Sequence, residues 1–156
     1  MADAPGFPPT LRSPIDMDSG ITHVALVVRD VEASIAFYTR FAGMRVIHQR
    51  EAQGDIEEVV WMTDFTRPFA LVLIASTKLH DTPVGPFGHL GVACASRAEV
   101  DRAADAAREL GILRSPPKDS GPPTGYWTYL ADPDGNTLEL SHGQEIAFTV
   151  KDAQRL

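Results

Sequence analysis

The feature that most constrains the fold is an internal repeat. A strand-like run, a helical run and a glycine follow one another twice along the chain, first from "THVALVVRD" and again from "GHLGVACAS". Each strand-like run opens on a histidine, and these two residues, His23 and His89, lie 66 positions apart. A repeat at this spacing predicts two structurally equivalent units, since each copy encodes the same order of elements.

The start and end of each helix are marked in the sequence. Asp30 and Ser96 are suited to cap a helix, because their side-chain oxygens accept a free backbone N–H. "SRAE" from Ser96 also has the spacing of a capping box. Apolar residues then recur at helical spacing, and a glycine follows each run. We expect helices over 31–42 and 97–110, ended by Gly43 and Gly111.

Three strand-like runs follow each helix, so each half has the order βαβββ. They are "MRVIHQR", "IEEVVWMT" and "FALVLIAS" in the first half, and "ILR", "GYWTYLA" and "NTLELSH" in the second. "DPDGN" joins the last two as a hairpin turn. The sequence therefore predicts an α+β chain. We expect an extended arm over 1–19, one domain over 20–143 made of modules 20–76 and 87–143 with linker 77–86, and a tail over 144–156.

Strand parity places three polar side chains on the sheet faces turned away from the helices. Side chains alternate between the two faces of a strand, so His23 and His89 are accompanied mainly by small residues. On the last strand Glu139 takes the same face, while its neighbours Leu138 and Leu140 take the core face. Two imidazoles and one carboxylate form a divalent-metal site if they converge. The alternative is that each residue is a half-exposed strand residue with no ligand.

Composition and charge exclude several classes of partner. Hydrophobic residues make up 44% and charged residues 22%, as in an ordinary globular domain. A net charge of −7 disfavours nucleic acid and anionic membranes, and no apolar run is long enough to cross a bilayer. The single cysteine, Cys94, and the absence of a secretory signal pattern lead us to expect a cytoplasmic location.

With these features in place, the sequence resembles the vicinal oxygen chelate superfamily, which includes glyoxalase I, methylmalonyl-CoA epimerase, fosfomycin and bleomycin resistance proteins and extradiol dioxygenases. The motifs that carry the resemblance are "THVALVVRDVEASIAFYTRFAGMRV", "FGHLGVA" and "YLADPDGNTLEL", within residues 20–143. The resemblance implies two βαβββ modules forming a cupped mixed sheet around a metal. It implies that His23, His89 and Glu139 are the metal ligands.

Departures from the family pattern bear on the reaction. Leu73 is predicted to fall at the position of the fourth ligand of glyoxalase I and the epimerase, which leaves three ligands. Fosfomycin enzymes usually have threonine where this chain has Ala25. Extradiol dioxygenases use a histidine just upstream of the turn motif, and "SGPPTGYWT" contains none. The resemblance favours an extradiol-dioxygenase-like oxygenation; a glyoxalase- or epimerase-type isomerase or lyase, a fosfomycin-type transferase and a bleomycin-resistance-like binding protein stay open.

The resemblance also implies roles and partners. The ion is expected to be Fe(II), with Mn, Zn, Ni or Co as alternatives, and the substrate a small molecule with adjacent oxygens. Tyr129 is the candidate catalytic hydrogen-bond or proton donor and, with Trp61 and Trp127, a candidate substrate-binding residue. The alternative is that the tryptophans pack in the core and Tyr129 is a wall aromatic. A homodimer is expected, and the sequence does not decide whether one chain or two supply the ligands. His48 and His80 could shuttle protons only if the fold brings them to the cup.

Overall fold

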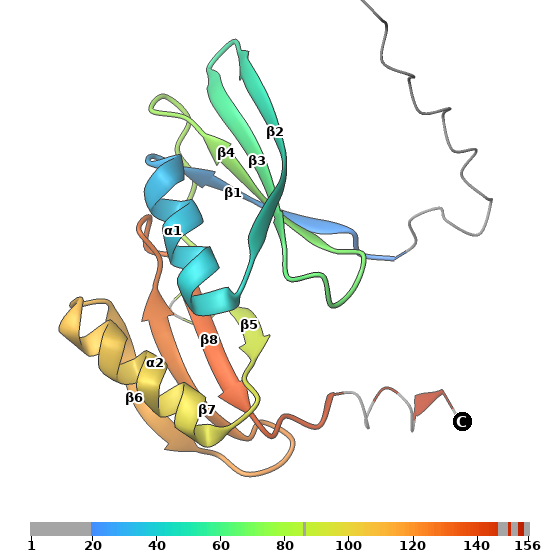
Figure 1. The fold of residues 1–156 in the computed structure, drawn as a ribbon, viewed down its shortest axis with the longest axis vertical. Helices are drawn as coiled ribbons and strands as arrows, with labels where there is room; N and C mark the ends of the chain where they lie inside the picture. Colours follow the sequence, from blue (N-terminus) through green and yellow to red (C-terminus); the bar gives the residue numbers. More distant parts are fainter. Residues whose placement is uncertain (1–19, 86, 147–149, 151–152, 155–156) are drawn as a thin grey trace, which may run out of the picture.

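The structure, a computed structural model, describes residues 20–85, 87–146, 150 and 153–154 and consists of two βαβββ modules (Figure 1). The predicted N-terminal arm lies outside the described residues. The N-terminal module contains β1 His23–Val28, α1 Val31–Ala42, β2 Arg45–Gln53, β3 Ile56–Thr63 and β4 Ala70–Ala75. The C-terminal module contains β5 Leu90–Ala93, α2 Arg97–Glu109, β6 Leu113–Asp119, β7 Tyr126–Ala131 and β8 Thr137–His142.

Each module has its own four-stranded mixed sheet, and the two sheets have equivalent topology. The strand orders are β1-β4-β3-β2 and β5-β8-β7-β6. The first pair in each sheet is parallel and the other pairs are antiparallel. This arrangement confirms the predicted α+β fold with two βαβββ modules. It also places β1 and β5 at an edge of their sheets, because each pairs with only one neighbour.

The helix boundaries follow the capping residues. The Asp30 carboxylate accepts a hydrogen bond from the backbone of Ala33, and the Ser96 hydroxyl accepts one from Glu99. Gly43 ends α1 in the left-handed conformation at φ 63° and donates its N–H to Tyr38. Both predicted helices are therefore confirmed. Within the described residues, no helix combines the length and the apolar character that crossing a bilayer requires.

Strand β6 is longer than the short run that the sequence suggested. It extends to Asp119 and passes through Pro116 and Pro117, and its register against β7 shifts twice. Proline has no N–H to donate and is tolerated only where a ladder bond is absent. The prolines fit here because β6 is the outer strand of its sheet, with a partner on one side only.

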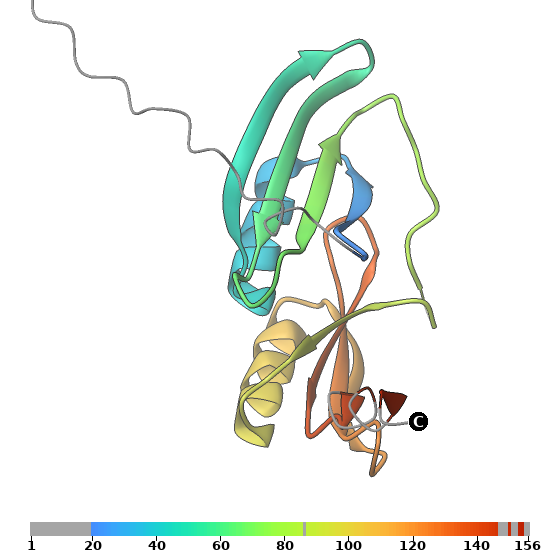
Figure 2. The ribbon, with the colours of Figure 1, turned by 90° about the vertical axis from the view of Figure 1, so that its right-hand side faces the viewer.

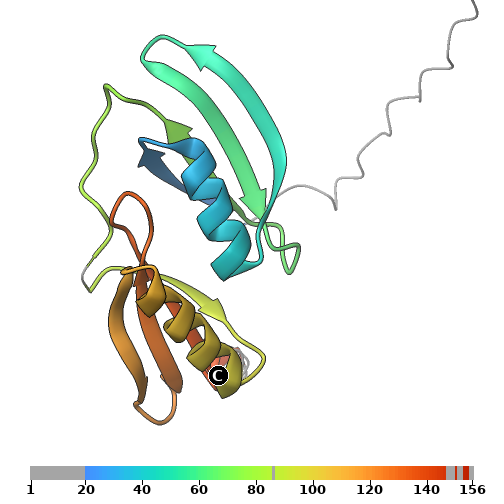
Figure 3. The same ribbon diagram turned by 60° about the vertical axis from the view of Figure 1, so that its left-hand side comes forward.

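Both helices cover the same side of the molecule, each over its own sheet (Figure 3). The linker after β4 runs along the opposite part of the molecule to reach the C-terminal module (Figure 2). Side chains on the helix side of the strands are buried; they include Leu26, Val60, Leu73, Leu130, Leu138 and Leu140. On each sheet the other face has no helix over it. We call these the open faces, and they carry the candidate site residues.

The modules share one hydrophobic core although no hydrogen-bonded ladder joins their sheets. A buried hydrogen bond crosses between them, since the Tyr38 hydroxyl on α1 donates to the Asp132 carboxylate in the β7–β8 turn at 2.8 Å. Burial and the nearby Asp132 charge raise the pKa of Tyr38 far above its usual value, so the hydroxyl stays protonated. A second crossing pairs Arg29 Nε with Asp134 at 3.0 Å. The turn that the sequence predicted is therefore also the joint between the modules.

Replacing Tyr38 by phenylalanine removes the buried donor and leaves its ring in the core. We expect the free energy of unfolding to fall by about 1.5–3 kcal/mol, as for a hydrogen bond to a charged group. Urea unfolding followed by circular dichroism measures the change. Tyr126→Phe is the matched control, because the Tyr126 hydroxyl donates to Asp101 at the protein surface. If both substitutions lower the free energy of unfolding equally, the buried hydrogen bond stabilises the protein no more than the exposed one.

Candidate metal and substrate site

Three predicted site residues meet on the open face of the C-terminal module. Glu139 on β8 lies directly across from Gly91 on β5 and from Tyr129 on β7. His89 immediately precedes β5, and its Nε2 lies 3.4 Å from Oε2 of Glu139. The small residue beside Glu139 leaves room in front of the carboxylate, because a Cβ at Gly91 would meet no atom within 4 Å. No side chain therefore fills the space above Gly91, next to Glu139.

The His89 ring is oriented by a backbone carbonyl. Its Nδ1 lies 2.8 Å from the Phe87 carbonyl oxygen, which can only accept a hydrogen bond. We therefore assign the hydrogen of a neutral ring to Nδ1, which leaves the Nε2 lone pair facing the Glu139 carboxylate. Two acceptors at this distance need a proton or a cation near both. An imidazole fixed through its other nitrogen is the usual arrangement of a metal-binding histidine, so this pair fits a divalent ion.

The Glu139 carboxylate is buried and has further partners. Its side chain is 4% exposed, against 33% for His89. Oε1 accepts a hydrogen bond from Nε2 of Gln144 at 2.7 Å, and the Tyr129 hydroxyl donates to the same carboxylate. A buried carboxylate needs such partners or a cation, since an uncompensated charge is costly away from water. Oε2 is the oxygen turned toward His89.

Tyr129 contacts both candidate ligands. Its ring centroid is 5.2 Å from that of His89 and 4.5 Å from that of Trp127. Burial, the negative charge of Glu139 and the hydrogen bond to it raise the pKa of the Tyr129 hydroxyl above its ordinary value. The hydroxyl is therefore protonated at neutral pH. It can donate a hydrogen bond but is a poor base.

His23 lies on the other sheet and does not join this group. It is exposed at the start of β1, and its Nδ1 is 3.0 Å from the Thr22 hydroxyl. Its strand belongs to the upper module of Figure 1, whereas β5 and β8 belong to the lower one. Among the described residues of one chain, no three histidine, cysteine, aspartate or glutamate side chains form a group that could hold a metal. A single chain thus assembles the pair His89 and Glu139 without the third predicted ligand.

The position assigned to Leu73 from the sequence is wrong. Leu73 lies across from Leu26 and is fully buried on the helix side of β4. The residues of β4 that share the open face with His23 and Ala25 are Ala70, Val72 and Ile74. None of these three can bind a metal. The sequence led us to expect no fourth metal ligand on β4, and the residues that bear on this expectation are these three and not Leu73.

The two tryptophans lie on different sheets. Trp61 on β3 pairs with Val72, which places it on the open face of the N-terminal module. The ring of His48 on β2 lies 5.0 Å from that of Trp61, so His48 borders the same face as His23. Trp127 belongs to the C-terminal open face and donates from its ring nitrogen to Ser120. Within one chain the tryptophans therefore do not wall a common pocket.

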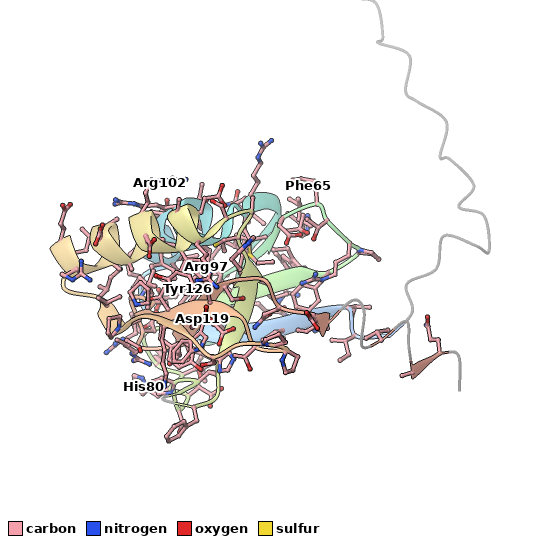
Figure 4. The ribbon with its side chains drawn as sticks, turned by 90° about the horizontal axis from the view of Figure 1, so that it is seen from below. Phe65, His80, Arg97, Arg102, Asp119 and Tyr126 are labelled. Atoms are coloured by element: carbon pink, nitrogen blue, oxygen red, sulfur yellow. The ribbon has the colours of Figure 1, made fainter. Side chains whose placement is uncertain are left out.

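The remaining histidines and the cysteine lie away from the pair. Nδ1 of His142 contacts the Cys94 carbonyl at 3.1 Å, and both residues are half-buried. Burial raises the pKa of the Cys94 thiol, as expected for an unreactive side chain. Figure 4 places His80 at the edge of the molecule, on the linker. It lines a pocket of about 300 Å³ with Arg29 and Asp134, which is separate from His89 and Glu139.

Some features of the surroundings had no signal in the sequence. A cavity of about 760 Å³ lies between the modules and reaches His89 and Gln144, with Arg67 and Phe69 on its other side. The β3–β4 loop carries Phe65 at φ 60°, an uncommon conformation for a bulky residue. Figure 4 shows a further group, Arg97, Asp119 and Tyr126, in which Arg97 pairs with Asp119 and lies over the Tyr126 ring.

Comparisons with known proteins agree with this architecture. A family model described as the Glyoxalase/Bleomycin resistance protein/Dioxygenase superfamily matches residues 20–140. An uncharacterized protein of Pseudomonas aeruginosa is 39% identical over 132 residues, covering 83% of this chain and 93% of that protein.

Solved structures share the fold at lower identity. A fosfomycin resistance protein of Listeria monocytogenes, complexed with Mn(II) and 1S,2S-dihydroxypropylphosphonic acid, is 19% identical with a TM-score of 0.63, covering 86% of this chain and 99% of the other. Glyoxalase I of Leishmania major is also 19% identical, with a TM-score of 0.62, covering 88% of this chain and 96% of the other. The open faces, the paired modules and the match over residues 20–140 together establish that this chain belongs to the Glyoxalase/Bleomycin resistance protein/Dioxygenase superfamily.

Proposed function

We propose that this protein is a divalent-metal-dependent enzyme that acts on a small substrate through two adjacent oxygens. The observation that carries the proposal is the pair of His89 Nε2 and Glu139 Oε2, which face each other at 3.4 Å. The fixed Nδ1–H of His89 leaves Nε2 free as a ligand. An imidazole and a carboxylate suit Fe(II), Mn(II) and similar ions, and they leave coordination positions for a substrate.

The third ligand in this proposal comes from a second copy of the chain. His23 is exposed, and among the residues that the structure describes no carboxylate joins it in a metal-binding group and no second histidine joins His89 and Glu139. Strands β1 and β5 are sheet edges, so their backbone groups are available to pack against another subunit. A two-fold dimer would bring the partner subunit's His23 to this pair twice, by symmetry. Trp61 and Trp127 of different subunits would then border one cup.

The bound ion would act as a Lewis acid and stabilise negative charge on a substrate oxygen. The protein side chains have distinct parts in this proposal. His89 and Glu139 would hold the ion, and Gly91 would leave space for the substrate. Tyr129, whose hydroxyl lies beside Glu139, would donate a hydrogen bond to a substrate oxygen or hold the proton to be delivered there.

Non-oxidative chemistry is the better supported reaction class. The structural relatives are glyoxalase I and a fosfomycin resistance protein, and the diol in the latter complex has the adjacent oxygens that the proposal requires. The extradiol oxygenation expected from the sequence is the second candidate, favoured by the set of two histidines and one glutamate. The third reading, a drug-binding protein without catalysis, requires that the protein bind no metal.

Metal binding by mixed dimers tests the shared site. We expect the His23→Ala and Glu139→Ala homodimers to lose divalent-metal binding. A heterodimer of these two variants, isolated with two different affinity tags, should bind about one ion per dimer, because one of its two sites receives all three ligands. Elemental analysis and calorimetric titration with Mn²⁺ measure the stoichiometry.

A heterodimer of His89→Ala with Glu139→Ala provides the control. His89 and Glu139 of one site come from the same chain in this proposal. Each site of this heterodimer therefore lacks one of the two, and no ion should bind. Equal binding by both heterodimers, or none by either, would contradict a site shared in this way. If the wild-type protein binds no divalent metal, the proposal of a metal-dependent enzyme is wrong and a drug-binding function is favoured.

The reaction class is tested by turnover with and without oxygen. Protein loaded with Mn²⁺ or Fe²⁺ is offered a hemithioacetal, an epoxide and an epimerisable acid under anaerobic conditions, and a panel of catechols in air. We expect turnover in the anaerobic set, with loss on chelation and recovery on adding metal back. Oxygen consumption with a catechol, combined with inactivity in the anaerobic set, would instead establish the dioxygenase alternative.

A further inference from the structure

Gln144 is a residue to which the preceding proposal gives no role, although it contacts a proposed ligand. Its Nε2 donates to Oε1 of Glu139 at 2.7 Å, and its side chain lines the cavity between the modules. Gln144 follows β8 and does not belong to the sheet. It is therefore a hydrogen-bond donor brought to Glu139 by the chain beyond the last strand.

The backbone at the end of β8 makes this contact possible. Along a regular strand, residues 139 and 144 would point to opposite faces. The strand ends at His142, and Gly143 adopts φ 78°, a left-handed conformation in which glycine is favoured. The chain thereby turns, and the Gln144 amide reaches back to the carboxylate on the open face.

The contact occupies one of the two carboxylate oxygens. With Oε1 held by the amide, Oε2 is the oxygen that faces His89. An amide is a neutral donor, so it orients the carboxylate without cancelling the charge that attracts a cation. A lysine or arginine at this position would neutralise Glu139 and compete with the metal. Hydrogen bonds of this kind to ligating carboxylates tune metal affinity in many sites.

On this basis we propose that Gln144 is a positioning residue, which holds Glu139 for coordination through Oε2. The inference rests on the proposed metal function and adds to it a residue outside the three ligands. Gln144 does not itself touch the ion or the substrate. Its contribution is to limit the carboxylate to one orientation before the ion binds.

Substitution of Gln144 tests the inference. We expect Gln144→Leu, which keeps the size but removes the donor, to weaken Mn²⁺ binding about 10–100-fold in calorimetric titration. The visible d–d spectrum at saturating Co²⁺ should also change, because a reoriented carboxylate alters the coordination geometry. Gln144→Asn, which has the amide but is one methylene shorter, should restore part of the affinity only.

Gln49→Leu is the matched control. Gln49 donates its amide to Glu58 at 3.3 Å on the exposed β2–β3 hairpin, so the same chemical change is made far from the ligands. Thermal unfolding of the metal-free variants shows whether the substitution causes a folding defect. If Gln144 served only to anchor the chain after β8, the Co²⁺ spectrum of saturated protein would stay unchanged. Unaltered Mn²⁺ affinity and spectrum in Gln144→Leu, with normal binding by wild type, would overturn this inference alone. Absence of binding by wild type would overturn the metal site itself.

Discussion

The arrangement of the two modules depends on the buried hydrogen bond between Tyr38 and Asp132. The donor lies on the N-terminal helix, and the acceptor lies in the turn before the last strand. Asp132 is itself held by the backbone and side chain of Asn136, so the acceptor is rigid. Because a buried carboxylate left without its donor is costly, this bond restricts how the modules can pack. Tyr38 is also a member of the apolar core that the two modules share.

This packing explains why the predicted site is divided. The helix sides of both modules contribute to the shared core, and the open faces have no helix over them. One open face carries His23 and the other carries His89 and Glu139. A repeat of βαβββ units thus yields two unequal halves, and among the described residues the buried carboxylates, Asp132 and Glu139, both belong to the second half. In the dimer that we propose, two copies of the chain would bring these halves together.

The elements were predictable because they depend on local chemistry. Asp30 and Ser96 set the helix starts, and the period of two along the strands separated Glu139 from its leucine neighbours. The placement of Leu73 failed since an error of one residue in register moves a side chain to the other face. Whether His23 meets His89 depends on tertiary packing through Tyr38, which no local pattern encodes. Gln144 escaped notice because its approach to Glu139 depends on a backbone turn after the strand.

The prolines of β6 have a consequence for the solubility of the protein. An open sheet edge can recruit further strands and begin aggregation, and proline, which has no N–H to donate, weakens such an edge; Pro116 and Pro117 both lie in the outer strand of the C-terminal sheet. The corresponding outer strand of the other sheet, β2, carries Arg45, Arg50 and Glu51 and is exposed along its length. Uncontrolled strand addition is therefore discouraged at the outer strand of each sheet, by proline in β6 and by charge in β2.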